Sequence, residues 1–330
     1  MIDQALVRAA RAWRSVAGDK TALEKYVKRR YRKVLQKETG RYATQFSGPN
    51  EVVVRAKAKP DEPKVGIFLK GGCDLPTMFL MGPMIRDDLR TGTVAIHRPS
   101  ESVGSSHSSQ LLESSAGIPM DLIVETCRRL EIKRSFFKPV LFEDRFGLSA
   151  LPKMGSFPKT VVVLSIASDL TRSLHRHREH GFLVDIGGWW LNQSLDKAIK
   201  DVDTLRWFKD TFEPVGRTGV HEFQANFESI VKRLNQMGSH TIVLNSLGLD
   251  PQNPTHNYQL LNVDQATRRR DFNAAIADLS SSVGFHVLDV DRILKLQGVK
   301  EQVDFAHASL EAKLPIAREG YRILRELEVI

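Results

Sequence analysis

The sequence of 330 residues predicts an α/β fold: a doubly wound parallel sheet flanked by helices, with a basic helical extension at its N-terminus. From residue 64 onward, apolar segments of strand length alternate with helical patterns of about a dozen residues or more. The segment at 160–166, TVVVLSI, is apolar throughout, which is typical of a parallel strand covered on both faces.

Charge divides the chain into two parts. Residues 1–60 hold 15 basic and 5 acidic side chains, whereas the other 270 residues hold 33 and 34. We therefore predict a basic extension at 1–60 and an α/β domain at 61–330. A nearly neutral domain does not indicate a nucleic-acid-binding protein.

The extension shows two helical patterns, at 2–16 and 20–38. Its basic amphipathic helices either dock on an anionic membrane surface or an acidic protein partner, or pack their apolar side on the domain. With only two cysteines, Cys73 and Cys127, and no apolar run of about 20 residues, the composition favours a cytoplasmic protein. Membrane docking of the extension would place it at the inner membrane face.

The elements of the domain follow in order. We predict strands at 52–56, 64–69, 92–97, 139–142, 160–166, 240–247 and 285–290. We predict helices at 119–131, 192–213, 220–237, 264–283 and 314–328. Since ligands bind outside the carboxyl ends of strands in open α/β sheets, the residues after each strand are the first candidates for chemistry.

The first candidate follows the strand at 64–69, where the sequence reads KVGIFLKGGCD. Gly71 and Gly72 permit a tight turn, and Cys73 then precedes a predicted helix start, a position that favours the thiolate. Cys73 is either a nucleophile or a small buried residue in the turn.

The second candidate is Asp304-Phe305-Ala306-His307, before the last helix. A carboxylate three residues before a histidine is able to orient the imidazole and raise its basicity.

The second half of the chain resembles the SGNH/GDSL-type hydrolases. The pattern is a helix FESIVKRLNQMG, the strand TIVLNSL, a long loop, the helix RRRDFNAAIADLSSSVG, the strand FHVLDV and the block DFAH. The resemblance implies that Asp304 and His307 are the acid and base of a catalytic triad. It places Gly71-Gly72-Cys73 at the Gly-Asp-Ser position, with cysteine in place of serine.

A cysteine at that position resembles the WcbI-like proteins of capsular polysaccharide biosynthesis. Arg98-Pro99-Ser100 and Glu143-Asp144-Arg145-Phe146 resemble two further motifs of those proteins. The resemblance spans about residues 64–328. It implies acyl transfer to a surface or capsular glycan, with acyl-CoA as co-substrate and no bound cofactor.

The oxyanion-hole blocks of the superfamily match less well. Gly104 stands for the glycine of the second block, and Gly72 contributes to the turn. Ala167-Ser168-Asp169 replaces the third block, so that the Ser168 hydroxyl takes the place of an asparagine amide. One lost donor raises a barrier by about 3 kcal/mol. We expect Arg98, Ser100, Arg145 and Arg172 to bind substrate or phosphate.

Two other segments carry polar side chains. The loop at 100–115, with eight serines and His107, is either a flexible surface loop or a site for phosphate or sugar. The segment RSLHRHREH at 172–180 lacks metal-ligand spacing and indicates a basic cluster that attracts anionic substrate, so no metal site is predicted.

The sequence thus favours an acyltransferase or esterase with a Cys73–His307–Asp304 triad and a glycan acceptor. The alternative is a non-catalytic SGNH-like scaffold that docks through its basic extension.

Overall fold

The computed structural model describes residues 42–46, 51–56, 65–71, 75, 94–99, 107–113, 117–130, 141–142, 155, 157–186, 194–249, 264–297 and 310–329. The three segments at 42–46, 51–56 and 94–99, and a few helix-end residues, are described by their backbone alone. The predicted helices at 2–16 and 20–38 lie outside these residues.

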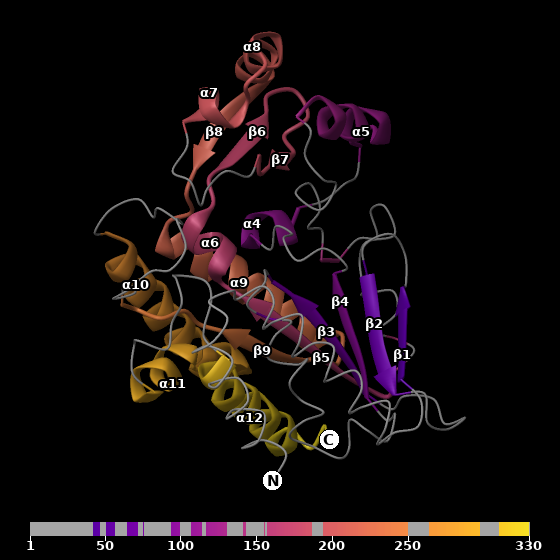
Figure 1. Cartoon of the computed structure of the whole chain (residues 1–330), viewed down its shortest axis with the longest axis vertical. Helices are drawn as coiled ribbons and strands as arrows, with labels where there is room; N and C mark the ends of the chain where they lie inside the picture. The colour runs from indigo at the N-terminus through magenta and orange to yellow at the C-terminus, as the bar shows by residue number, and fades with distance from the viewer. Residues whose placement is uncertain are drawn as a thin grey trace, which may run out of the picture.

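A seven-stranded sheet forms the body of the protein (Figure 1), with the strand order β1-β2-β4-β3-β5-β9-β10. Its strands are β1 (Tyr42–Phe46), β2 (Glu51–Ala56), β3 (Val65–Lys70), β4 (Val94–Pro99), β5 (Lys159–Ser165), β9 (His240–Leu244) and β10 (His286–Leu288). The five strands from β4 to β10 in this order are parallel, which confirms the predicted α/β fold with a parallel sheet.

The first two strands lie within residues that the charge pattern assigned to the extension. β2 pairs antiparallel with β4, and β1 pairs antiparallel with β2. Among the described residues, the sheet therefore includes two strands from the N-terminal side of the predicted boundary at residue 60.

Each face of the sheet is covered by its own hydrophobic core. Successive side chains of the central strands point to opposite faces and therefore enter different cores. Val161 and Val163 of β5 pack with Tyr321 of α12 (Leu310–Glu326) and Leu294 of α11 (Val290–Gln297). On the other face, Val162 and Leu164 pack with phenylalanines of α9 (Val220–Gln236) and α10 (Asp264–Leu279). This double burial explains why β5 is apolar throughout.

A second, three-stranded antiparallel sheet was not predicted. Its strands are β6 (Leu174–His177), β7 (Leu183–Val184) and β8 (Phe212–Gly216), in the order β7-β6-β8. It shares a separate core with α5 (Met120–Arg129) and α8 (Val202–Thr211), built on Phe208, Phe212 and Phe182. In Figure 1 the small helices α4 (Ser108–Leu111) and α6 (Ala167–Thr171) lie between the two sheets.

Several predicted elements differ in detail because polar caps end them. The predicted helix at 192–213 is divided into α7 (Leu195–Ala198) and α8, since Asp201 begins a new helix by accepting a hydrogen bond from Thr204 N at 2.8 Å. The predicted strand at 285–290 ends at Leu288, because Asp289 caps α11 through Arg292 N at 3.0 Å.

Two other predictions change at their ends. The helix predicted at 264–283 closes with a π-helical turn, η6 (Ser280–Gly284). Of the strand predicted at 139–142, the two described residues, Leu141 and Phe142, form a bend.

Candidate functional site

The strand order places a topological switch point between β3 and β5. From β3 the chain moves to β4 on one side, and later to β5 on the other, so the winding direction reverses between β3 and β5. In doubly wound sheets this switch point, at the carboxyl ends of the strands, is where ligands bind. The segments that follow β3 and β5 therefore form the candidate site.

The carboxyl end of β3 lies tightly against that of β5. A Cβ atom on Gly71 would lie 2.7 Å from Leu75 Cγ and 2.8 Å from Ser165 Cβ, so only glycine permits this approach. Gly72 and Cys73, the predicted turn and nucleophile, come next in the chain but lie outside the described residues.

Lys70, the last residue of β3, also lies at the switch point, and the sequence analysis did not single it out. Its side chain is only 8 % exposed, and the strand alternation puts it on the same face as Phe68. A lysine that ends an otherwise apolar strand at a switch point was the available signal.

The carboxyl end of β5 continues through Ile166 into α6, which begins with Ala167 and carries Ser168 and Asp169. Ser165 Oγ accepts a hydrogen bond from Ala167 N at 3.1 Å, which turns the chain sharply at the carboxyl end of β5. Ser168, the predicted oxyanion donor, is buried at this turn, beside the switch point.

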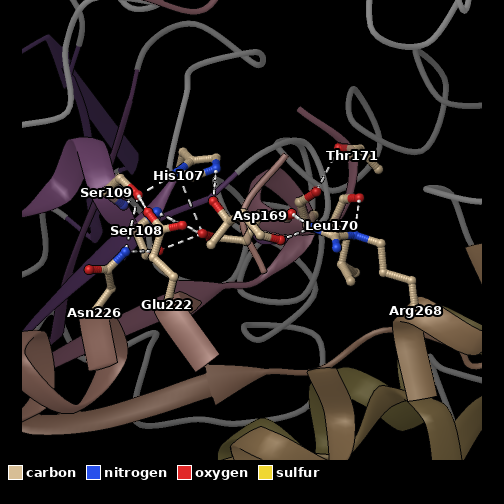
Figure 2. Close-up of polar contacts among 11 residues, drawn as sticks. His107, Ser108, Ser109, Asp169, Leu170, Thr171, Glu222, Asn226 and Arg268 are labelled. Atoms are coloured by element: carbon tan, nitrogen blue, oxygen red, sulfur yellow. Dashed lines mark hydrogen bonds and ion pairs between the residues drawn. The ribbon is translucent and has the colours of Figure 1, made fainter. Parts of the chain in front are cut away.

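Asp169 is the centre of a buried polar network (Figure 2). Its carboxylate accepts hydrogen bonds from Ser108 N at 3.0 Å and from Ser108 Oγ at 2.5 Å. Asn226 Nδ2 of α9 donates to Ser108 Oγ at 3.1 Å. These contacts join the segment after β5 to the serine-rich segment after β4.

Opposing effects act on the pKa of the carboxyl at the centre of this network. Burial raises the pKa of the Asp169 carboxyl, while His107, the Ser108 hydrogen bonds and Arg268 lower it in part. His107 Nδ1 lies 3.5 Å from Asp169 Oδ1.

His107 and Ser108 exclude one of the two alternatives, the flexible surface loop, for this part of the serine-rich segment. Both side chains are fully buried, and His107 Nδ1 accepts a hydrogen bond from Ser109 N at 3.3 Å at the start of α4. His107 Nε2 lies 2.8 Å from Thr218 Oγ1. This end of the loop is therefore a packed structural element and not a flexible surface loop.

The predicted phosphate role of Arg172 is not retained. Arg172 is 3 % exposed, and its guanidinium forms a buried ion pair with Asp185. The arginine holds the start of the small antiparallel sheet, and its charge is directed into the protein.

The predicted basic cluster at 172–180 is also corrected. His175 and His177 lie on strand β6, and burial lowers the pKa of each. His177 Nδ1 accepts hydrogen bonds from the backbone N–H groups of Glu179 and His180, both at 3.2 Å. These two imidazoles are neutral near pH 7 and belong to the core of the small sheet.

Most other predicted site residues are not described. Arg98 lies in β4 opposite Val52, by its backbone alone. The remaining ones lie outside the described residues: Ser100, Gly104, Arg145, Asp304 and His307.

In the described part of the chain, no group of three or more His, Cys, Asp or Glu side chains is arranged to hold a metal ion. No helix among the described residues combines the length and apolar character needed to cross a bilayer.

Comparison with known proteins gives distant structural matches only. No protein-family model and no curated protein sequence matches the chain. An acetylxylan esterase from Geobacillus stearothermophilus is 11 % identical, with a TM-score of 0.39, over 80 % of this chain and 94 % of that one. A putative acylhydrolase from Bacteroides fragilis is 10 % identical, with a TM-score of 0.40, over 82 % and 92 %. An extracellular lipase from Streptomyces rimosus is 9 % identical, with a TM-score of 0.37, over 77 % and 98 %. At these values the matches do not assign a family, and the fold rests on the strand order described above.

Proposed function

We propose that this protein is an acyl-transfer enzyme, an esterase or acyltransferase that acts on a carbohydrate. The observation that carries the proposal is the switch point between β3 and β5. The chain segment that contains Cys73 leaves one of these strands, and the segment that contains Ser168 leaves the other.

In the proposed reaction, the Cys73 thiolate attacks the carbonyl carbon of an acyl donor. His307 takes the proton of the Cys73 thiol, and the electron pair of the carbonyl moves to its oxygen. When this intermediate collapses, the bond to the leaving group breaks, the His307 imidazolium gives that group the proton so that it departs as an alcohol or thiol, and a thioester remains on Cys73. A hydroxyl group of water or of a glycan then attacks the thioester. His307 takes the proton of that hydroxyl and returns it to the departing Cys73 sulfur, while Asp304 orients His307.

Lys70 adds a positive charge to this scheme. It ends β3 three residues before Cys73, and it is buried at that end of the strand. A cation close to a cysteine stabilises the thiolate and so lowers the pKa of the thiol.

The finer assignments belong to the same proposal. Acyl-CoA is the proposed donor and a surface or capsular glycan the acceptor, with Arg98, Ser100 and Arg145 as the groups that bind donor or substrate. Ser168, Gly72 and Gly104 supply oxyanion donors. The basic residues 1–60 hold the enzyme at an anionic membrane surface or an acidic protein.

Alkylation of the native protein tests the nucleophile. The chain has two cysteines, and Cys127 is buried in the core of the small sheet, so iodoacetamide reports on Cys73. We expect Cys73 to alkylate with a midpoint well below the ordinary thiol value of about 8.5, and His307→Ala to raise that midpoint. A native Cys73 that alkylates like a model thiol overturns the assignment.

Intact-mass measurement tests the transfer. Incubation with acetyl-CoA or p-nitrophenyl acetate is expected to add one acetyl group to the wild type and none to Cys73→Ser. If Cys73 is reactive but no acyl adduct forms with either donor, the non-catalytic scaffold becomes the better description.

A further inference from the structure

Asp169 fastens the segment after β5 to helix α4. Ser108 donates to the Asp169 carboxylate through both its backbone N–H and its hydroxyl, although the two residues are 61 positions apart in the chain. Ser108 begins α4, so the carboxylate holds the first turn of that helix. The first fastening therefore comes from the side of β4.

Arg268 of α10 fastens the same segment from the opposite side (Figure 2). Its Nη2 donates to Asp169 O at 2.7 Å, and its Nε donates to Leu170 O at 3.0 Å. The guanidinium also lies over the Phe272 ring, 4.3 Å from its centre, which fixes its direction. The backbone and the side chain of Asp169 are thus held by different helices.

Burying a carboxylate is unfavourable, since the charge loses its hydration. A neutral side chain would tie α4 to this segment at a lower cost in desolvation. The carboxyl stands directly after Ser168, where its bonds to Ser108 and the bonds of Arg268 fix Asp169 and Leu170 beside the switch point. This combination indicates a requirement for accurate placement there rather than for stability alone.

We infer that Asp169 and Arg268 are positioning residues, which hold the Ile166–Arg172 segment so that Ser168 presents its donor to the acyl group at the switch point. The inference rests on the proposed acyl-transfer function. Neither residue contacts the reacting atoms; both act through the placement of Ser168.

The test compares Asp169→Asn and Arg268→Lys with Arg269→Lys. Arg269 is the matched control because it is the next residue of α10 and also donates to backbone carbonyls, those of Leu247 and Leu249, at 3.3 and 3.1 Å. Each full-length variant is first compared with the wild type in thermal unfolding. Steady-state hydrolysis of p-nitrophenyl acetate then gives kcat and KM, and alkylation by iodoacetamide gives the reactivity of Cys73.

We expect Asp169→Asn and Arg268→Lys to lower kcat by about 10- to 100-fold, because a small misplacement of a donor weakens its hold on the developing charge. We expect KM and the alkylation rate of Cys73 to stay within about threefold of the wild type. A variant that was merely destabilised would change these two quantities together with kcat. Arg269→Lys leaves kcat unchanged. A folded Asp169→Asn protein with wild-type kcat overturns the inference while the proposed function stands.

Backbone hydrogen exchange separates this inference from the proposed function. In Asp169→Asn and Arg268→Lys, amides of residues 166–172 are expected to exchange at least about tenfold faster, whereas Arg269→Lys affects residues 247–249. Unchanged exchange at 166–172 overturns the fastening even if the enzyme is active. If exchange is faster in the variants but the wild type neither hydrolyses the ester nor acylates Cys73, the proposed function is overturned. The hydrogen bonds of Asp169 and Arg268 would then hold the segment without a role in catalysis.

Discussion

The segments that leave two neighbouring strands, β5 and β9, are built in different ways. Residues 166–172, after β5, contain two buried ionisable side chains. Asp169 is held by Ser108, 61 positions away, and Arg172 by Asp185, 13 positions away. Residues 245–249, after β9, are Asn, Ser, Leu, Gly and Leu, and carry no charge of their own.

The β9 segment is held by neutral amides, by partly exposed acids and by the buried Arg269 of α10, which donates to the carbonyls of Leu247 and Leu249. Asn273 of α10 exchanges two hydrogen bonds with the backbone of Ser246, at 3.1 and 2.6 Å. Asn245 Nδ2 donates to Asp289 Oδ1 at 2.8 Å, and Gly248 N donates to Asp291 Oδ1 at 2.7 Å. The charged groups that hold this segment therefore all come from outside it. After β5 the segment itself carries two buried ionisable side chains, Asp169 and Arg172, and it lies at the switch point.

The largest effect is expected from Asp185→Ala, which leaves the Arg172 guanidinium buried without this partner. Removal of one member of a buried ion pair costs about 3–5 kcal/mol in the free energy of unfolding. Urea denaturation measures it. Glu213→Ala is the control, since the Arg178–Glu213 pair is exposed and its loss is expected to change stability by less than about 1 kcal/mol. Equal losses in the two variants would contradict the importance of the buried charge.

A glycine at each strand end extends the comparison. Gly71→Ala forces a Cβ atom to within 2.8 Å of Ser165 Cβ, in the packed core at the switch point, and we expect a loss of about 1–3 kcal/mol. In Gly248→Ala the nearest atom is Arg270 Cγ, at 2.8 Å, in an exposed and flexible side chain. We expect that variant to lose clearly less free energy of unfolding. Thermal unfolding of both proteins measures the difference, and equal losses would show that the two glycines are equally tightly packed.

Asn273→Ala sharpens the comparison from the β9 side. It removes two hydrogen bonds to partly buried Ser246, for an expected loss of about 1 kcal/mol. Hydrolysis of p-nitrophenyl acetate per folded molecule should stay at the wild-type level. A fall in kcat as large as that of Asp169→Asn would remove the functional difference between the two segments.

The smallest effect is a pH dependence. The ordinary pKa of an Asp carboxyl is 3.8, and burial raises that of Asp169 above it. Between these two values the folded protein keeps a proton that the unfolded chain has released, so this group's contribution to stability falls as the pH rises. Asp169→Asn lacks this contribution. We therefore expect the variant to gain stability relative to the wild type as the pH rises above 3.8, as measured by urea denaturation at several pH values. A constant difference would show that the carboxyl has its ordinary pKa.

The centre of the large sheet was predictable because β3, β5 and β9 are buried on both faces. Runs such as Val161–Leu164 have no competing helical pattern, and Gly71 marks the end of β3. The small sheet was missed because β6 reads LHRH, in which the buried His177 and the half-buried His175 look like exposed polar residues. Helix α11 was missed because Asp289 is both the residue after β10 and the cap of the helix.

The candidate site was predictable only in part. Ser168 could be placed from the end of a single strand, and the turn at Gly71 from another. The bond between Ser108 and Asp169 joins residues far apart in the chain, and no local pattern indicates it. Arg172 looked like a phosphate ligand because its partner, Asp185, is visible only once the small sheet is folded.

Arg268 joins the two ends of the segment that contains the small sheet. Its Nη2 binds Asp169 O, just before the small antiparallel sheet, and also Thr218 O, just after it, at 2.6 Å. The two ends of an excursion of nearly fifty residues thus meet at one nitrogen atom. A segment whose ends meet can be lengthened, shortened or exchanged for another while the parent sheet keeps its strand order. The small sheet therefore has the form of an inserted segment. Arg268 of α10 would hold the ends of any segment that replaced it.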